Sequence, residues 1–305
     1  MRKVVIVGAG AMGCLFAARM VKAGADVTLV DVDKPRLEAL AREGVSLSDE
    51  SGERVVPVKA GLSGEVSGPA DLILMFTKGL HTAAAAKSVA HLHGGQTYAL
   101  TLQNGVGNAE VMAQVFPPER VLHGIAELPA DLQGPTSVSS HGKGAVRLGG
   151  YTAAASAGVP MAVELLTKAG FETIADPDVE AAIWEKLAFN AALNSVGAVL
   201  GMTNGQVADS PSRRIAYAIA AETAETATAK GIRVDAQAIR DKIDYALAHH
   251  RGHKASMLQD RLAGRKTEIE TINGAVVRAA EAVGVPTPVT CVLADLIRTI
   301  DQYQG

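Results

Sequence analysis

The feature that most constrains this chain is a glycine-rich turn placed directly after a short apolar strand. Residues 4–7 read Val-Val-Ile-Val, a continuous apolar run typical of a parallel strand buried on both faces. A match to G-x-G-x-x-G follows, and a helix is expected from about Ala11 to Ala23. In that context the glycines allow a tight turn, close approach of a pyrophosphate and close packing of helix on strand. The motif predicts a dinucleotide site formed by Gly8, Ala9, Gly10, Ala11, Met12 and Gly13.

An acidic residue, Asp31, closes the second expected strand at 27–30. A carboxylate there can accept hydrogen bonds from ribose hydroxyls, and it repels a 2′-phosphate. Asp33 is the better placed cap for the next helix, which leaves Asp31 for a ligand. Lys34 and Arg36 are the counter-argument, because a basic pair nearby offsets the repulsion. The pattern favours NAD(H) as the cofactor, with NADP(H) as the alternative.

The first half of the 305-residue chain alternates strands with helices, which predicts a Rossmann-type α/β domain: a doubly wound parallel sheet. Near Pro177 the pattern changes, and we expect an all-α domain beyond it, so the predicted domains are 1–176 and 177–305. Further strands are expected at 71–76, 98–102 and 121–125, with an added hairpin over 136–150. Helices are expected at 35–43, 81–92, 109–115, 179–202, 211–230, 236–249, 267–284 and 290–302.

A polar stripe runs along one of these helices, which is otherwise apolar. Lys186, Asn190 and Asn194 are spaced i, i+4 and i+8, so they share one face, and between them stand only Leu, Ala and Phe. A helix apolar on nearly all sides is buried, so its polar residues need partners, either buried side chains or a ligand. Beside a nicotinamide site the ligand interpretation is favoured. A lysine can protonate the oxygen of a carbonyl under reduction, and amides can hold hydroxyl or carboxylate groups.

Composition excludes several classes of function. Lys plus Arg number 29 and Asp plus Glu 32, and the net charge of −3 predicts no nucleic-acid partner. The longest uncharged stretch of apolar character, 187–202, is too short for a membrane span, so no membrane partner is expected. Cys14 and Cys291 are far apart, which favours a reducing compartment, the cytoplasm. The eight histidines show no metal-ligand spacing, and no metal is expected.

Other polar residues are not distinguished by their spacing alone. Lys78 and Asn104 follow two expected strands at their carboxyl ends, where ligands of open α/β sheets bind, although Asn-Gly is also a common turn pair. Thr267-x-x-Glu270 has the pattern of a capping box, which predicts Glu268 in the first turn of a helix as a solvated carboxylate. Ser256 stands in no pattern.

Together these residues make the chain resemble, essentially end to end, the ketopantoate reductase (2-dehydropantoate 2-reductase) family. The blocks between Ser256 and Gly274 are the most specific. The resemblance rests on Gly8-Ala9-Gly10-Ala11-Met12-Gly13, Lys78, Leu102-Gln103-Asn104-Gly105-Val106-Gly107, Lys186-x-x-x-Asn190-x-x-x-Asn194, Ser256-Met257-Leu258-Gln259-Asp260, Lys266-Thr267-Glu268-Ile269-Glu270 and Ile272-Asn273-Gly274.

The resemblance implies an enzyme that reduces the ketone of a small 2-ketoacid with a nicotinamide cofactor. It implies Lys186 as the general acid. It implies Glu268 as the carboxylate partner of Lys186 and as the anchor of the substrate hydroxyl. We expect Glu268 to be close enough to pair with Lys186 across the cleft between the domains. The other implied site residues are Asn190, Asn194 and Ser256 on the hydroxyl and carboxylate of the substrate, and Lys78 and Asn104 near the nicotinamide and the carbonyl.

Three places depart from the family pattern. Val32 stands where the family usually carries a basic residue for the 2′-phosphate of NADPH. Residues 126–133 differ from the usual Thr/Gly/Ala-rich segment, and His253 stands where some members have a polar amide. The departures concern the cofactor and the substrate more than the reaction.

Other functions stay open. An NAD-dependent 2-hydroxyacid dehydrogenase on the same scaffold would use the same lysine and cofactor. The β-hydroxyacid dehydrogenases share the glycine turn and a K-x-x-x-N helix, but the block from Ser256 to Gly274 argues against them. A non-catalytic dinucleotide-sensing protein needs neither Lys186 nor Glu268, so their presence together argues against it. The helical half has apolar periodicity for a homodimer interface, although its own core would require the same pattern.

Overall fold

The computed structural model describes residues 1–303 and divides the chain into two compact units. The domain limits expected from the sequence, 1–176 and 177–305, stay a prediction. The first unit comprises Met1–Gln103 and Asn108–Val179, and the second comprises Asn104–Gly107 and Glu180–Gly305.

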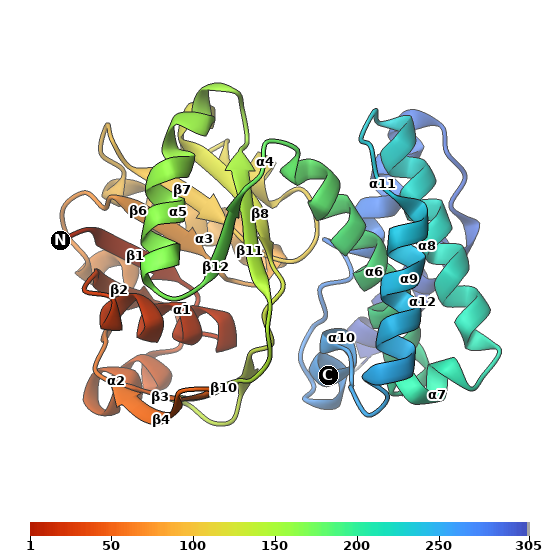
Figure 1. Cartoon of the computed structure of the whole chain (residues 1–305), viewed down its shortest axis with the longest axis horizontal. Helices are drawn as coiled ribbons and strands as arrows, with labels where there is room; N and C mark the ends of the chain where they lie inside the picture. The colour runs from red at the N-terminus through yellow and green to blue at the C-terminus, as the bar shows by residue number, and fades with distance from the viewer. Residues whose placement is uncertain (304–305) are drawn as a thin grey trace. The chain divides into compact units, whose positions relative to one another are not determined.

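The first unit is built on an eight-stranded sheet (Figure 1). Its strands are β1 (Lys3–Val7), β2 (Asp26–Val30), β5 (Lys59–Gly61), β6 (Leu72–Met75), β7 (Tyr98–Thr101), β8 (Val121–Ala126), β11 (Ala145–Gly150) and β12 (Glu172–Ala175). They follow the order β12-β11-β8-β7-β6-β1-β2-β5. All neighbours pair in parallel except β11 and β8, which are antiparallel. This is the mixed α/β class that the alternating sequence predicts.

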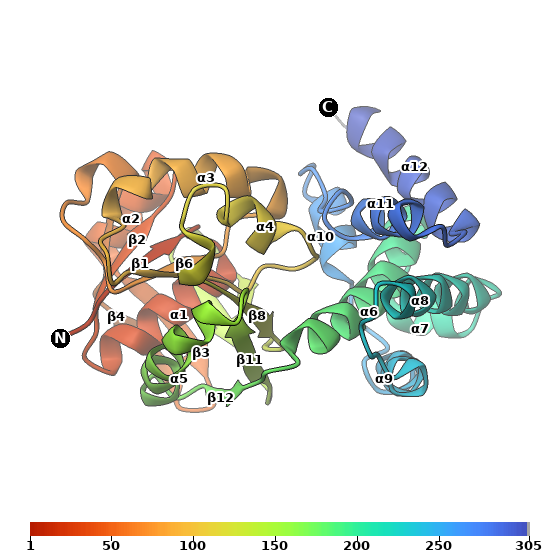
Figure 2. The same cartoon turned by 90° about the horizontal axis from the view of Figure 1, so that it is seen from above.

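Both faces of this sheet are covered by helices, as Figure 2 shows from above. Successive residues of a strand point to opposite faces. Val4 and Ile6 of β1 accordingly belong to a core with residues of α1 and α5, whereas Val5 and Val7 belong to a second core with residues of α3 and α4. The helices of this unit are α1 (Ala11–Lys22), α2 (Lys34–Glu43), α3 (Thr82–Ser88), α4 (Asn108–Met112) and α5 (Val159–Lys168).

A smaller sheet in the same unit corrects one prediction. Its strands are β3 (Val45–Asp49), β4 (Gly52–Val56), β9 (Asp131–Leu132) and β10 (Ser137–Ser140), in the order β4-β3-β10-β9. The hairpin expected over 136–150 is wrong, because β10 pairs with β3 and β9 while β11 pairs with β8 and β12 of the large sheet. The partner β3 lies far from β10 along the chain, so local alternation could not reveal that pairing.

The second unit is helical, as expected. Its helices are α6 (Val179–Leu200), α7 (Asn204–Ala208), α8 (Ser212–Ala229), α9 (Ala236–His249), α10 (Ser256–Leu262), α11 (Asn273–Val283) and α12 (Pro288–Tyr303). The middle of α6 is buried on nearly all sides, with Leu187, Ala188, Ala191 and Ala192 each at most 1% exposed. The predicted helix at 267–284 begins later, at Asn273, which changes the setting of Glu268.

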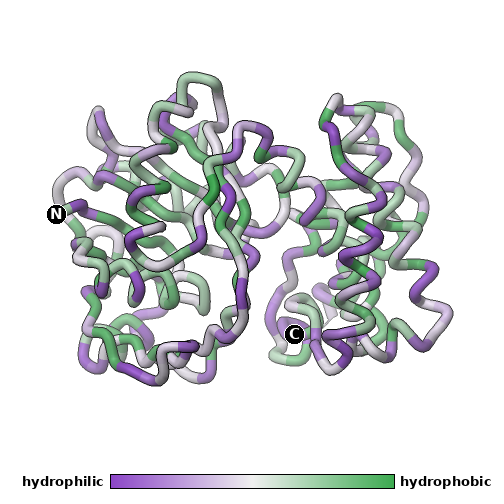
Figure 3. The backbone as a smooth tube through the Cα atoms, in the orientation of Figure 1, coloured by the Kyte–Doolittle hydropathy of each residue, from purple (hydrophilic) through white to green (hydrophobic). Residues whose placement is uncertain are grey.

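Hydrophobic stretches, coloured green in Figure 3, run along strands of the first unit and along helices of the second. Over residues 1–303, no helix is both long enough and apolar enough to cross a membrane. Short 3-10 turns connect the elements at Ser63–Glu65, Gly79–His81, Ala90–Leu92, Pro118–Arg120 and Ala154–Gly158.

Candidate functional site

The glycine-rich turn connects β1 to α1 with very close packing. A Cβ at Gly13 would stand 1.9 Å from the carbonyl oxygen of Gly8, so only glycine lets the first turn of α1 approach the strand end. Gly8 has a φ of +107°, and a Cβ there would lie 2.7 Å from the backbone nitrogen of Thr77. A Cβ at Gly10, the N-cap of α1, would point into open space. The turn therefore offers bare backbone at the N-terminus of a 12-residue helix, which suits an anionic group.

Two neighbours hold the carbonyl of Ala9 in this turn. Arg36 Nη1 donates to it at 3.3 Å, and the thiol of Cys14 donates to it at 3.4 Å. Burial raises the pKa of the Cys14 thiol to about 12, so this group stays neutral near pH 7 and acts as a packing residue.

Asp31 follows β2 and turns its carboxylate back to the glycine-rich turn. Its Oδ2 accepts a hydrogen bond from the N–H of Ala9 at 2.6 Å, and its Oδ1 accepts from Val32 at 2.7 Å and from Asp33 at 3.1 Å. The cap of α2 is Asp33, which accepts from the N–H of Arg36, as the sequence predicts. Asp31 therefore orders the glycine-rich turn and does not cap α2.

The carboxyl ends of β6 and β7 are joined by Gln103. This buried amide donates to the carbonyl of Thr77 at 2.6 Å and to the hydroxyl of Thr82 at 2.9 Å, and it accepts from Thr101 at 2.8 Å. Lys78 lies in the loop so held and is half-buried. The sequence reasoning assigned Gln103 no role of its own, because one amide at a strand end gives no periodic signal.

In the helical unit, α6 carries the polar stripe. Asn190 and Asn194 are 9% and 6% exposed, so the buried setting expected for the stripe is observed. Asn194 Nδ2 donates to the hydroxyl of Ser256 at 3.3 Å, which brings together two predicted substrate ligands 62 residues apart in sequence. Lys186 is half-buried one turn before Asn190 on the same helix.

A second pair of predicted residues also meets within this unit. Asn104 Nδ2 lies 3.5 Å from Glu268 Oε2, across 164 residues of sequence. The contact depends on Gly105, whose φ is +85° and whose Cβ would stand 2.0 Å from the carbonyl oxygen of Thr271. Val106 N–H donates to that same carbonyl at 3.1 Å. The pairing of Glu268 with Lys186 stays a prediction.

The capping box predicted at Thr267 and Glu270 is wrong. Residues 267–272 form turns, and the Glu270 side chain bonds to Arg298 and Arg278 rather than to a helix N-terminus. Thr267 does accept from the N–H of Ile269 at 3.3 Å, but its own hydroxyl donates to Asp301. Glu268 therefore lies in an irregular segment, where the residue is half-buried.

One further residue links this segment to α6. Asn273 is fully buried and donates from Nδ2 to the carbonyl of Ala191 at 3.0 Å, between Asn190 and Asn194. In the sequence Asn273 precedes a glycine, and Asn-Gly is an ordinary turn pair, so its position alone indicates no further role. Only the fold shows that it joins the two elements that carry the predicted site. Among residues 1–303, no group of three or more His, Cys, Asp and Glu side chains could hold a metal ion.

Comparison with known proteins matches both units. The family model "Ketopantoate reductase PanE/ApbA" matches residues 4–153, and its C-terminal counterpart matches residues 178–301. A 2-dehydropantoate 2-reductase of Archaeoglobus fulgidus is 33% identical over 98% of both chains, and that of Halobacterium salinarum is 30% identical over 97% of this chain and 98% of its own.

Solved structures agree on the fold. D-mandelate dehydrogenase, in a ternary structure with NADH and anilino(oxo)acetate, superposes with a TM-score of 0.94 over 99% of both chains, at 25% identity. The 2-dehydropantoate 2-reductase of Geobacter metallireducens superposes with a TM-score of 0.90 over 97% of this chain and 99% of its own, at 29% identity.

Proposed function

Because this chain belongs to the ketopantoate reductase family, of nicotinamide-dependent oxidoreductases, we propose that it reduces the ketone of ketopantoate to the hydroxyl of pantoate. The proposal rests on two contacts between predicted site residues in the helical unit. Asn194 meets Ser256, and Asn104 meets Glu268. Both contacts join residues that the family resemblance assigns to the substrate, and they do so between segments far apart in the chain.

Lys186 is the general acid in this proposal. The nicotinamide cofactor supplies the hydride when it is bound. As negative charge develops on the ketone oxygen, the ammonium of Lys186 stabilises it and delivers the proton from Nζ. Glu268 holds the substrate hydroxyl and is the carboxylate partner of Lys186. Asn190, Asn194 and Ser256 orient the hydroxyl and carboxylate, with two donors and one acceptor on each amide.

The residues present fit a dinucleotide. A bare backbone at Gly10 leaves room for the pyrophosphate, and the N-terminus of α1 favours its charge. Lys78 and Asn104 would border the nicotinamide. Asp31 uses three acceptor positions on backbone N–H groups, and a carboxylate has about four, so one is left for a ribose hydroxyl. With Val32 beside it, we propose NAD(H) as the preferred cofactor and NADP(H) as the alternative.

A second candidate function is NAD-dependent oxidation of a D-2-hydroxyacid. It is favoured by the TM-score of 0.94 with D-mandelate dehydrogenase, whose structure holds NADH and a 2-ketoacid derivative. The sequence favours ketopantoate, because the reductase of Archaeoglobus fulgidus is 33% identical, against 25% for the mandelate enzyme. Both candidates use the same lysine and the same class of substrate.

A panel of 2-ketoacids assayed with NADH and with NADPH separates the candidates. The proposal expects ketopantoate to give the highest kcat/KM. A higher kcat/KM for phenylglyoxylate, the ketoacid of mandelate, would favour the dehydrogenase function. Binding of NADH without turnover of any ketoacid would favour a dinucleotide sensor.

We also propose a cytoplasmic homodimer formed through the helical unit. Val292, Leu296 and Tyr303 leave apolar side chains exposed along α12, at 57%, 45% and 76%, and a Staphylococcus aureus ketopantoate reductase of similar fold is described as dimeric. The free cysteines Cys14 and Cys291 suit a reducing compartment. Sedimentation velocity of the parent and of Leu296→Glu tests the interface; a monomeric parent would exclude it.

A further inference from the structure

Glu268 lies in a segment without regular secondary structure. Residues 263–272 separate α10 from α11, and their backbone forms turns rather than a helix. Segments of this kind open easily unless tertiary contacts hold them. A carboxylate that meets a substrate must stay within about 0.5 Å of its productive position, so this segment needs anchors.

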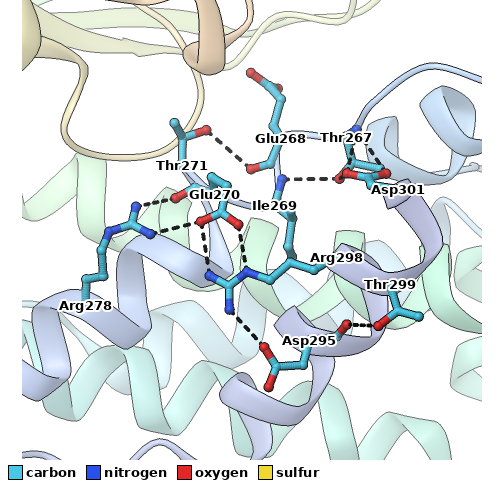
Figure 4. Close-up of polar contacts among 10 residues, drawn as sticks. All are labelled: Thr267, Glu268, Ile269, Glu270, Thr271, Arg278, Asp295, Arg298, Thr299 and Asp301. Carbon is cyan, nitrogen blue, oxygen red and sulfur yellow. Dashed lines mark hydrogen bonds and ion pairs between the residues drawn. The ribbon is translucent and has the colours of Figure 1, made fainter. Parts of the chain in front are cut away.

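The first anchor is Asp301, near the end of α12. Its two carboxylate oxygens accept from the backbone N–H of Thr267 at 3.1 and 3.3 Å, and one of them also accepts from the Thr267 hydroxyl at 2.8 Å (Figure 4). Thr267 is 4% exposed, so these bonds are largely shielded from water. Because Thr267 directly precedes Glu268, Asp301 fixes the backbone that leads into the carboxylate.

The second anchor is Glu270, two residues after Glu268. Its carboxylate accepts from Arg298 at 2.7 and 3.0 Å and from Arg278 at 3.0 Å, and the hydrogen bonds of Arg298 hold the pKa of Glu270 below its usual value. These three side chains are 37–57% exposed, so water screens their ion pairs. Asp301 is therefore the stronger anchor of the two.

The side chain of Glu268 points away from these two anchors. Figure 4 shows its carboxylate pointing away from Asp301 and Arg298, and its Oε2 lies near Asn104 Nδ2 at 3.5 Å. The two anchors, Asp301 and Glu270, thus hold the backbone on both sides of Glu268 and leave its carboxylate for other contacts.

We propose that Asp301 is a positioning residue that acts through Thr267 to hold the Glu268 carboxylate in the active site. The inference rests on the proposed function, in which Glu268 meets the substrate and Lys186. Asp301 itself touches no reacting group. It contributes by limiting how far the segment moves, because a misplacement of about 1 Å in a catalytic group can cost about a hundredfold in rate.

The test compares Asp301→Ala with Asp301→Asn. Alanine removes all bonds to Thr267, so kcat/KM for ketopantoate should fall roughly ten- to a hundredfold, with the Kd of the dinucleotide unchanged. The asparagine amide can still accept from the Thr267 N–H and donate to its hydroxyl, so it should restore kcat/KM to within about fivefold of the parent. If alanine leaves kcat/KM within twofold, or if asparagine is as damaging as alanine, the proposal is overturned.

Glu222→Ala is a matched control at the other end of α12. Glu222 on α8 accepts from the N–H groups of Val289 and Thr290, at 2.9 and 2.8 Å, and from the Thr290 hydroxyl at 2.6 Å. It therefore repeats the bonding of Asp301, about 16 Å away along the helix at 1.5 Å per residue. Its loss should lower the Tm and leave kcat/KM within about threefold. A loss of activity equal to that of Asp301→Ala would assign Asp301 a general structural role.

A double-mutant cycle with Glu268→Gln completes the test. If Asp301 acts through Glu268, adding Asp301→Ala to Glu268→Gln should change kcat/KM by less than about threefold, whereas additive losses overturn the proposal. If Glu268→Gln alone has no effect, the role proposed for Glu268 fails, and the positioning role falls with it. Should Asp301→Ala not fold, Thr267→Val removes only the hydroxyl bond, and it must show the same non-additivity with Glu268→Gln.

Discussion

Replacing Asp31 should reverse the choice of cofactor. The perturbation is the double change Asp31→Ala with Val32→Arg, which removes the carboxylate proposed to bind the ribose and adds a guanidinium for a 2′-phosphate. Val32 is 91% exposed, so a longer side chain fits there without a clash. The change should shift the preference from NADH towards NADPH.

The magnitude follows from the setting of Asp31. Two like charges about 4 Å apart repel by about 1 kcal/mol in water and about 4 kcal/mol near a protein surface. Asp31 is half-buried, so a cost of about 2 kcal/mol for a 2′-phosphate is reasonable. At ~1.4 kcal/mol per decade, the parent should prefer NADH by about thirtyfold in kcat/KM.

Arg36 works against this preference. Its side chain is 25% exposed, and it is held beside the turn by the carbonyl of Ala9 and, at 4.0 Å, by Asp33. Only one of its five N–H donors is used in the bond to Ala9, and its Nε makes no hydrogen bond, so Arg36 keeps donors for a phosphate. The nearby Asp33 carboxylate balances part of its charge, so its attraction should only partly offset the repulsion by Asp31.

Steady-state kcat/KM with each cofactor, at fixed ketopantoate, measures the preference. Asp33→Asn is the matched control, since it removes a neighbouring charge while keeping an acceptor for the N–H of Arg36. It should change the NADH/NADPH ratio by less than about threefold. Equal efficiency with both cofactors in the parent, or an unchanged ratio in the double variant, would refute the reasoning and assign the choice to Lys34 and Arg36.

Three other predictions concern the acid, the fold of the site and pH. Lys186→Ala should lower kcat by about 10²–10⁴-fold while dinucleotide binding, followed by NADH fluorescence, is retained; a kcat within a few-fold of the parent would remove Lys186 from the mechanism. Gly105→Ala should lower kcat/KM at least about tenfold, because its Cβ would strike the Thr271 carbonyl at 2.0 Å. Gly107→Ala, also at positive φ but facing open space, should cost less, and equal losses would contradict the clash. Burial lowers the pKa of His123 to about 4 from the ordinary 6.5. As the pH falls, the unfolded chain therefore binds the proton before the folded protein does. The free energy of unfolding should fall by about 2 kcal/mol between pH 6.5 and 4.5. His123→Leu has no group that titrates there. Urea unfolding at both pH values should therefore show that its free energy of unfolding falls by about 2 kcal/mol less than that of the parent.

Local patterns in the sequence determined the elements that carry the site. Gly8 and Gly13 mark the turn after β1 because their spacing is set within one strand–turn–helix unit. The stripe from Lys186 to Asn194 could be read because residues four apart share a helix face. Asp31 could be recognised because it directly follows the next strand, β2, within the same strand–turn–helix–strand unit. Each of these predictions needs only one or two neighbouring elements.

Only the tertiary structure decided which of these residues meet. Asn104 reaches Glu268 across 164 residues, and Asn194 reaches Ser256 across 62. No periodicity records such pairs, because the hydrogen bond forms between segments whose separation in the chain is arbitrary. The capping box at Thr267 failed for the same reason: Asp301, 34 residues away, offers a carboxylate that binds the hydroxyl and the N–H together. In a capping box the Thr267 N–H would donate to the Glu270 carboxylate, but that carboxylate pairs with Arg278 and Arg298, so tertiary contacts replace the local motif at both of its ends.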